Sequence, residues 1–137
     1  MSFLLDVNVL VAWGWQDHVD HRRTVHWIAA QKKRRRVKLA TSPIPEIGFV
    51  RVAVQRGLGR VTISEAAEVL ESMLQSLGDR HRFLPDDVSG TVWPDWCRRP
   101  ADTTDAHLAR LAEKNGLKLA TLDTEIPNAL LLPLMAV

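Results

Sequence analysis

The strongest constraint in the sequence is a nearly continuous apolar run at residues 3–10 that contains one carboxylate, Asp6. A short apolar run of this kind is typical of a strand buried on both faces, as in the centre of a parallel sheet. An ionised aspartate inside such a strand costs several kcal/mol unless it is paired or bound to a cation. We therefore expect the strand to end at Asp6 and a short helix to follow near Asn8. Ligands of open α/β sheets bind at the carboxyl ends of the strands, so Asp6 is a candidate site residue.

Length and composition favour one globular domain. A chain of 137 residues is long enough to bury a substantial core, and we predict a single domain over residues 1–137. The single cysteine, Cys97, excludes an internal disulfide and fits a reducing compartment. No basic leader precedes the first apolar run, and the apolar tail at 129–137 is too short to cross a bilayer. These features predict a cytoplasmic protein that does not enter the membrane.

Strand-like and helix-like segments alternate along the chain. After the first strand, further strands are expected over residues 37–41, 81–84, 117–123 and 130–134. Helices are expected from Val9 to Trp13, from Asp17 or Asp20 to about Gln31, from Ser42 to Gly57, from Thr62 to Gly78, and from Thr103 or Thr104 to Asn115. The residues Pro85 to Asp87 are expected to begin another helix or turn. Such alternation predicts an α/β fold with a central, mostly parallel sheet of four to five strands flanked by helices.

Two of these helices have an identifiable inner face. Thr62 and Glu65 have the spacing of a capping box, and an apolar stripe of helical period follows them. In the helix that ends near Gln31, we expect Val25, Ile28 and Ala29 to face the core.

Four carboxylates are expected at the same edge of the sheet. Asp6 and Asp123 end strands, whereas Glu46 and Asp105 lie in the first turn of helices that follow strands. An acid at a helix start is favoured by the helix dipole alone, so Glu46 and Asp105 each have a simple structural explanation. Four acids at one edge would nevertheless repel one another unless a cation were present.

The donor set predicts the kind of cation. His18, His21 and His26 are expected to be polar residues on a helix face, and His107 should be directed away from Asp105. Carboxylates without histidine or cysteine partners favour a hard ion, Mg²⁺ or Mn²⁺. Such an ion suits phosphate chemistry, because it lowers the pKa of a bound water and neutralises charge on phosphoryl oxygens.

Two cationic segments each allow two interpretations. The run Lys32, Lys33, Arg34, Arg35 and Arg36 is either a solvated helix end that complements the dipole or a patch that contacts phosphates. The segment 93–100 brings two tryptophans close to two arginines, which suits stacking on unpaired bases but equally a packed loop or a protein interface.

The segments around the four acids resemble the successive acidic motifs of PIN-domain nucleases, and most closely the VapC toxins of prokaryotic VapBC toxin–antitoxin pairs. The matching motifs are residues 4–10, 45–51, 104–106 and 119–123, within a similarity that runs from about residue 3 to 133. The resemblance implies a three-layer PIN-like fold and a Mg²⁺- or Mn²⁺-dependent endoribonuclease. It also implies a homodimer and a VapB-type antitoxin whose tail enters the acidic groove.

The resemblance assigns roles residue by residue. Asp6 matches the first acid and is the expected direct metal ligand, and Asp105 and Asp123 would complete the coordination. Glu46 matches the second acid and would hold a second metal or orient the attacking water. Two polar residues are expected to orient the carboxylates by hydrogen bonds, namely Asn8 and Thr121.

Other assignments stay open at this point. Asp102 competes with Asp105 for the third acidic role, and Arg51 contacts either RNA, an antitoxin or a structural ion-pair partner. The implied reaction is attack of metal-bound hydroxide on an RNA phosphodiester, which leaves 5′-phosphate and 3′-hydroxyl ends. The alternative is a non-catalytic PIN-like module that binds RNA. A phospho-acceptor receiver domain fits less well, because Asp6 stands alone and no lysine follows Asp123.

Overall fold

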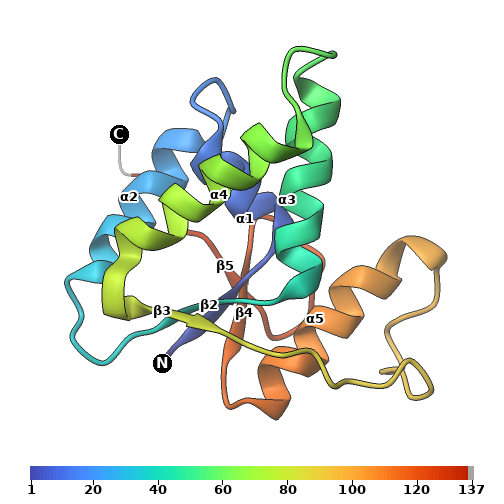
Figure 1. The fold of residues 1–137 in the computed structure, drawn as a ribbon. Helices are drawn as coiled ribbons and strands as arrows, with labels where there is room; N and C mark the ends of the chain where they lie inside the picture. Colours follow the sequence, from blue (N-terminus) through green and yellow to red (C-terminus); the bar gives the residue numbers. More distant parts are fainter. Residues whose placement is uncertain (136–137) are drawn as a thin grey trace.

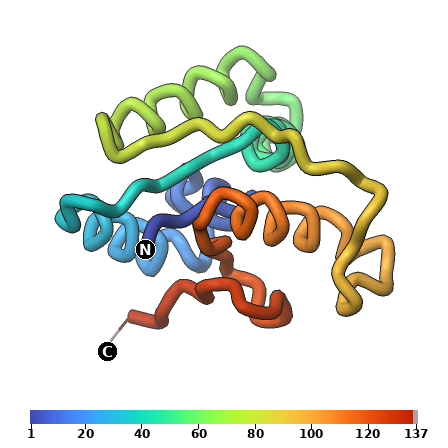
Figure 2. Tube along the Cα trace, turned by 90° about the horizontal axis from the view of Figure 1, so that it is seen from below, coloured from blue at the N-terminus to red at the C-terminus, as the bar shows by residue number. Residues whose placement is uncertain are grey.

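Five short parallel strands form the centre of the computed structural model, which describes residues 1–135; residues 136 and 137 of the predicted apolar tail lie outside the described part. The strands are β1 (Phe3–Leu5), β2 (Leu39–Thr41), β3 (His81–Phe83), β4 (Lys118–Thr121) and β5 (Leu130–Leu131). They are ordered β3-β2-β1-β4-β5, and every neighbouring pair is parallel. Figure 2 shows this order, with the yellow β3 segment at one side of the molecule and the red C-terminal segment at the other.

Helices cover both faces of this sheet. They are α1 (Val7–Gly14), α2 (His21–Lys32), α3 (Pro43–Arg56), α4 (Ile63–Leu77) and α5 (Thr103–Lys114), with single 3₁₀ turns η1 (Gly78–Arg80) and η2 (Pro100–Asp102). The first four helices pack on one face, and α5 packs on the other (Figure 1). The predicted three-layer α/β architecture is therefore confirmed. Within residues 1–135, no helix has the length and apolar character needed to cross a membrane.

The central strand β1 is buried on both sides, as its apolar sequence predicts. Side chains alternate along a strand, so Leu5 packs into the core beneath α1 to α4 while Leu4 packs into the core beneath α5. Both leucines are fully buried. Phe3 also faces the larger core, where its ring meets that of Trp27 edge-on at a centroid distance of 5.2 Å.

The helix with the strongest sequence signal forms as expected. In α4 the Thr62 hydroxyl accepts from the Glu65 backbone N–H, and the Glu65 carboxylate accepts from the Thr62 N–H, both at 3.0 Å. These reciprocal bonds are the predicted capping box.

The predicted inner face of α2 is wrong at two of three positions. Ile28 is buried, but Val25 and Ala29 are exposed. The buried stripe has the expected helical period and is formed by Thr24, Trp27, Ile28 and Gln31. Two of these four residues are polar, so a search for apolar residues alone selects the neighbouring stripe. Of the two predicted N-cap residues, Asp17 and Asp20, the structure has Asp20, although its side chain makes no capping hydrogen bond.

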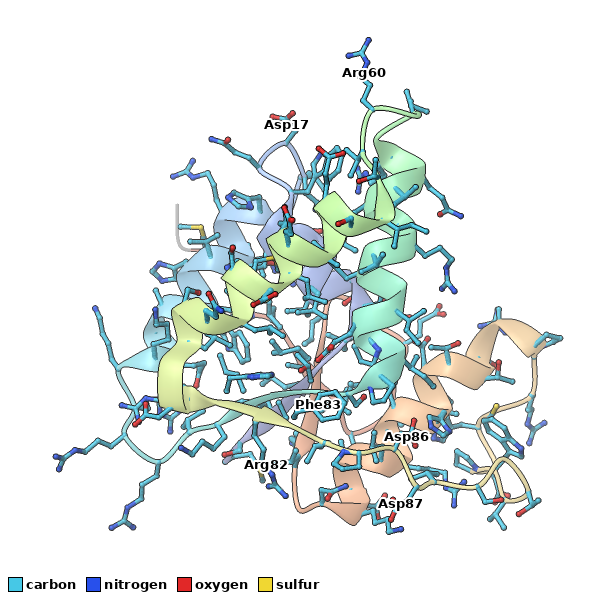
Figure 3. The ribbon with its side chains drawn as sticks, viewed as in Figure 1. Asp17, Arg60, Arg82, Phe83, Asp86 and Asp87 are labelled. Atoms are coloured by element: carbon cyan, nitrogen blue, oxygen red, sulfur yellow. The ribbon has the colours of Figure 1, made fainter. Side chains whose placement is uncertain are left out.

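Of the predicted helix or turn at Pro85, no helix forms, and Asp86 Oδ1 accepts from the Val88 backbone N–H at 3.2 Å. Residues 84–89 have no regular structure, and this segment runs alongside α5 (Figure 3). Asp86 Oδ2 lies 2.7 Å from His107 Nε2, and Asp87 pairs with Lys114 at 3.0 Å. These acids pair with α5 side chains instead of starting a helix. The predicted start of α5 also shifts, because Asp102 rather than Thr103 or Thr104 occupies the N-cap position.

Helices α1 and α3 cross closely at a glycine. A Cβ atom on Gly48 would lie 2.7 Å from Cγ2 of Val7, which is closer than real Cβ contacts. The missing side chain therefore lets the start of α1, which carries Asp6, approach α3.

Candidate active site

The parallel sheet brings three carboxylates together at the carboxyl edge of its strands. Asp6 directly follows β1, Asp123 follows β4, and Asp105 lies in the first turn of α5. Asp105 and Asp123 line one pocket of about 560 Å³, whereas Asp6 is buried with 3% of its surface exposed. These three acids occupy the edge that the sequence predicts.

Asp6 is a helix cap as well as a buried acid. Its Oδ1 accepts from the Val7 backbone N–H at 2.7 Å, which caps α1, and its Oδ2 accepts from the Thr121 hydroxyl at 2.7 Å. Burial raises the pKa of the Asp6 carboxyl, the two hydrogen bonds oppose that rise, and the charge of Asp123 adds to it. The carboxylate is thus desolvated but held in one orientation.

Thr121 in β4 and Asn8 in α1 fix that orientation. The Thr121 hydroxyl donates to Asp6 and accepts from Asn8 Nδ2 at 3.2 Å and from the Asp123 backbone N–H at 3.0 Å. Asn8 Oδ1 accepts from the Leu122 N–H at 3.1 Å. The hydroxyl has one donor and two acceptor sites, so it is fully used. Asn8 therefore reaches the carboxylates through Thr121, and not directly as the sequence analysis expects.

Asp105 has the most strongly altered acidity of the three. Partial burial, followed by the charges of Asp6 and Asp123, raises the pKa of its carboxyl to about 7. Asp123 lies close enough for its side chain to hydrogen-bond with Asp105, which also favours the protonated form. Mutual repulsion of this kind is relieved by a proton or by a cation.

The acids fit a divalent cation in charge and in donor type. They offer oxygen ligands only, which suits Mg²⁺ or Mn²⁺. Within residues 1–135, no three His, Cys, Asp or Glu side chains already form a ready-made ligand group. The fit therefore rests on the repulsion among three carboxylates and on their donor chemistry.

Glu46 does not join this set. Its Oε2 accepts from the Thr41 hydroxyl at 2.6 Å, and the same hydroxyl lies 2.7 Å from His81 Nε2. Glu46 and His81 line a separate hollow against α4, beside Leu70. Burial lowers the pKa of His81, and the charge of Glu46 opposes that effect. The structure thus brings together three of the four predicted acids. Thr41 and His81 were not predicted as partners of Glu46, although a threonine that ends a buried strand is an available signal in the sequence.

The Asp102 carboxylate is paired with an arginine. Its Oδ1 accepts from Arg99 Nη2 at 2.8 Å, and its Oδ2 accepts from the Arg99 backbone N–H at 3.2 Å. The Arg99 guanidinium holds the pKa of the Asp102 carboxyl below its ordinary value. Both alternatives line the pocket with Asp123, but the Asp102 carboxylate is paired with Arg99, whereas Asp105 meets the charges of Asp6 and Asp123.

The cationic run and Arg51 lie elsewhere. Residues 32–36 join the end of α2 to β2, which places them at the amino edge of the parallel sheet, opposite the acids. Backbone carbonyls of Lys32 and Arg35 accept from the Arg80 guanidinium at 3.2 and 2.7 Å. Arg51 lines an apolar groove between α3 and α4 together with Ile47 and Ile63.

Comparison with known proteins gives the family. Residues 3–129 match the PIN domain. The chain belongs to the PIN-domain family. This PIN domain is 39% identical over 127 residues to Ribonuclease VapC38 of Mycobacterium tuberculosis (strain ATCC 25618 / H37Rv), which covers 90% of this chain and 86% of that protein. It is 33% identical over 133 residues to Ribonuclease VapC39 of the same strain, which covers 94% of each chain.

A solved structure has the same fold as this PIN domain. The crystal structure of VapBC2 from Rickettsia felis, bound to a DNA fragment from their promoter, superposes with a TM-score of 0.53. The two chains share 16% of their residues, and the match covers 96% of this chain and 97% of that one. The resemblance to VapC proteins that the acidic motifs indicate is therefore confirmed.

Proposed function

We propose that this VapC-family PIN domain is an endoribonuclease toxin that depends on Mg²⁺ or Mn²⁺ and is neutralised by a VapB-type antitoxin. The observation that carries the proposal is the convergence of Asp6, Asp105 and Asp123 at one edge of the sheet. Relatives that are named ribonucleases support RNA as the substrate. The similar VapBC2 structure supports an antitoxin partner. A homodimer, which the family resemblance implies, belongs to the same proposal.

The three acids have distinct parts in this mechanism. A divalent cation held by Asp6, Asp105 and Asp123 would supply a bound water of lowered pKa and would neutralise charge on the phosphodiester. Thr121 keeps the Asp6 carboxylate facing the site, and Asn8 keeps the Thr121 hydroxyl in place. Asp105 must give up its proton before it can act as a ligand, because ligating carboxylates are deprotonated. In-line attack of water on phosphorus, with the 3′ oxygen leaving, gives 5′-phosphate and 3′-hydroxyl ends.

Glu46 is not needed for the first ion in this proposal. Its Oε2 accepts from the Thr41 hydroxyl, and its carboxylate would either bind a second ion or orient the attacking water.

Cleavage of RNA by the purified protein tests the proposal. We expect Mn²⁺-dependent cleavage that EDTA abolishes and that Asp105→Asn and Asp123→Asn both remove. Asp17→Asn is the matched control, because Asp17 is an exposed acid on the loop before α2 (Figure 3). The alternative, a non-catalytic module, predicts RNA binding without cleavage at any metal concentration. That result would refute the proposal.

A further inference from the structure

The pocket that contains Asp105 and Asp123 is also lined by side chains of positive charge. Besides these acids it is lined by Asp102 and Glu125, and by two cations, Arg98 and Arg99. No other cationic side chain among residues 1–135 lines it. The site described above uses neither arginine.

Arg99 lines the pocket and is paired with two acids. Its Nε and Nη2 donate to the two carboxylate oxygens of Asp102 at 3.3 and 2.8 Å, and Nη2 lies 3.8 Å from Glu125 Oε2. The arginine therefore connects η2 with the loop that follows β4. None of the hydrogen bonds among the described residues uses its Nη1, and 66% of its side chain is exposed. Donors of the guanidinium thus remain available to a ligand in the pocket.

The segment that carries Arg99 is anchored on both sides. Trp96 packs against the core beneath α5, near Leu117, and it also lines the pocket. The backbone N–H groups of Arg98 and Arg99 both donate to Asp102 Oδ2. A bidentate arginine–carboxylate pair fixes the plane of the guanidinium, so Arg99 is oriented before any ligand arrives.

The charges of the pocket indicate what Arg99 is for. An RNA phosphate that approaches this site meets four lining carboxylates with Asp6 close by, and one divalent ion compensates only part of that charge. The guanidinium fork of an arginine suits phosphate oxygens. In Arg99 the Nε and Nη2 groups hold Asp102, so Nη1, which donates to no other described residue, is the group left for a phosphate. We propose that Arg99 is a substrate-binding residue that grips a backbone phosphate of the RNA strand, with Asp102 as its positioning residue. This inference rests on the proposed function and adds a residue to it.

Binding and cleavage measurements on Arg99→Ala test this assignment. The probe is a fluorescein-labelled oligouridine, with EDTA present for the binding measurement and Mn²⁺ for cleavage. We expect the Kd and the KM to rise about tenfold, as for the loss of one charge-assisted contact. We also expect kcat to stay within about threefold of wild type, because ground-state binding affects KM. The slope of log Kd against log salt should fall by about 0.7, the value for one phosphate contact on a single strand.

Two further variants make the result decisive. Arg60→Ala removes the same charge from the exposed loop between α3 and α4 (Figure 3), and its Kd and salt slope should match wild type. Arg99→Lys keeps the charge without the fork, so its Kd should lie between those of wild type and Arg99→Ala.

The outcomes separate this inference from the proposed function. If wild type cleaves RNA and Arg99→Ala behaves like Arg60→Ala in Kd, KM and salt slope, the assignment of Arg99 is wrong and the nuclease proposal stands. A lower melting temperature of Arg99→Ala with unchanged RNA affinity would also refute it, because Arg99 would then only stabilise Asp102. If wild type neither binds nor cleaves the probe, both proposals fail.

Discussion

Asp6 and Asp105 show how local surroundings give two neighbouring carboxylates different properties. Asp6 is the more deeply buried, but it accepts hydrogen bonds from Val7 and Thr121, which favour its ionised form. Asp105 is only half-buried, yet the charges of Asp6 and Asp123 add to its desolvation and raise its pKa to about 7. The charge of Asp105 therefore changes near neutral pH.

The raised pKa of Asp105 makes cation binding depend on pH. Between the unfolded value of 3.8 and about 7, the folded protein keeps a proton that the unfolded chain releases, so this group's contribution to stability falls as pH rises through that window. A cation competes with the same proton. We expect Mn²⁺ to raise the melting temperature more at about pH 8 than at about pH 6. Equal shifts at both values, measured by differential scanning fluorimetry, would contradict this assignment.

Substitution of Asp105 should separate repulsion from ligation. Asp105→Asn removes one of three mutually repelling charges, so we expect the metal-free protein to melt a few degrees higher than wild type at alkaline pH. The same variant should lose the Mn²⁺-induced shift, because a ligand is gone. Asp17→Asn should change neither quantity. A metal-free Asp105→Asn that melts below wild type would show that the carboxylate stabilises the fold.

The Thr121 hydroxyl connects two of the acidic residues, because it donates to Asp6 and accepts from the backbone N–H of Asp123. Thr121→Val keeps the volume but leaves Asp6 Oδ2, Asn8 Nδ2 and the Asp123 N–H without this partner. We expect a loss of about 1–3 kcal/mol in the free energy of unfolding. Misorientation of Asp6 should also lower metal affinity or cleavage about 10- to 100-fold. Thr121→Ser retains the hydroxyl and should recover most of the activity; if it does not, the hydroxyl is not the cause.

Among the elements, the crossing of α1 and α3 allows a sharp test of packing. Alanine in place of a helical glycine ordinarily stabilises a protein by about 0.5–1 kcal/mol. At Gly48 the new methyl would lie 2.7 Å from Val7 Cγ2 and 2.9 Å from its Cγ1. Overpacking costs about 1–3 kcal/mol, so we expect Gly48→Ala to be destabilising in urea denaturation. The double variant with Val7→Ala should recover part of the loss, and no recovery would mean that Val7 is not the obstacle.

The elements differ in how far the sequence predicts them, for physical reasons. Helix α4 is specified locally by its capping box and apolar stripe, so its prediction holds. Helix α2 turns Thr24 and Gln31 inward, and such polar positions are set by tertiary packing. The segment after β3 is held beside α5 by pairs such as Asp86 with His107. These two residues are 21 positions apart, so no local sequence pattern reveals the path of the segment.

The candidate site also contains residues whose positions the sequence predicts and residues whose positions it does not. Asp6, Asp105 and Asp123 could be predicted because parallel strands bring their carboxyl ends to one edge, whatever the side-chain rotamers. Glu46 also lies near a strand end, but its direction is decided by the Thr41 hydroxyl. Arg99 faces the pocket because of its pair with Asp102. The sequence alone did not decide whether the segment that contains Arg99 stacks on bases or forms a packed loop or a protein interface.

Across the whole molecule, the longest cationic run is separated from the acids of the site. The run at residues 32–36 lies at the amino edge of the sheet and the acids lie at the carboxyl edge. A three-residue strand is roughly 10 Å long, which is about the Debye length at physiological salt. We therefore expect Lys33→Gln combined with Arg36→Gln to leave kcat unchanged and to alter KM less than about threefold. A large fall in kcat in steady-state cleavage assays would contradict this expectation and would mean that residues 32–36 contact the RNA near the cleaved bond.

The double use of Asp6 has a consequence for mutational escape. In cells that survive expression of a harmful enzyme, inactivating changes at Asp105 or Asp123 should accumulate as abundant, folded protein. Replacement of Asp6 by alanine removes the cap of α1 as well as an acid, so such survivors should instead contain little of the protein. Western blots of escape clones would show this difference in protein level from one position to the next.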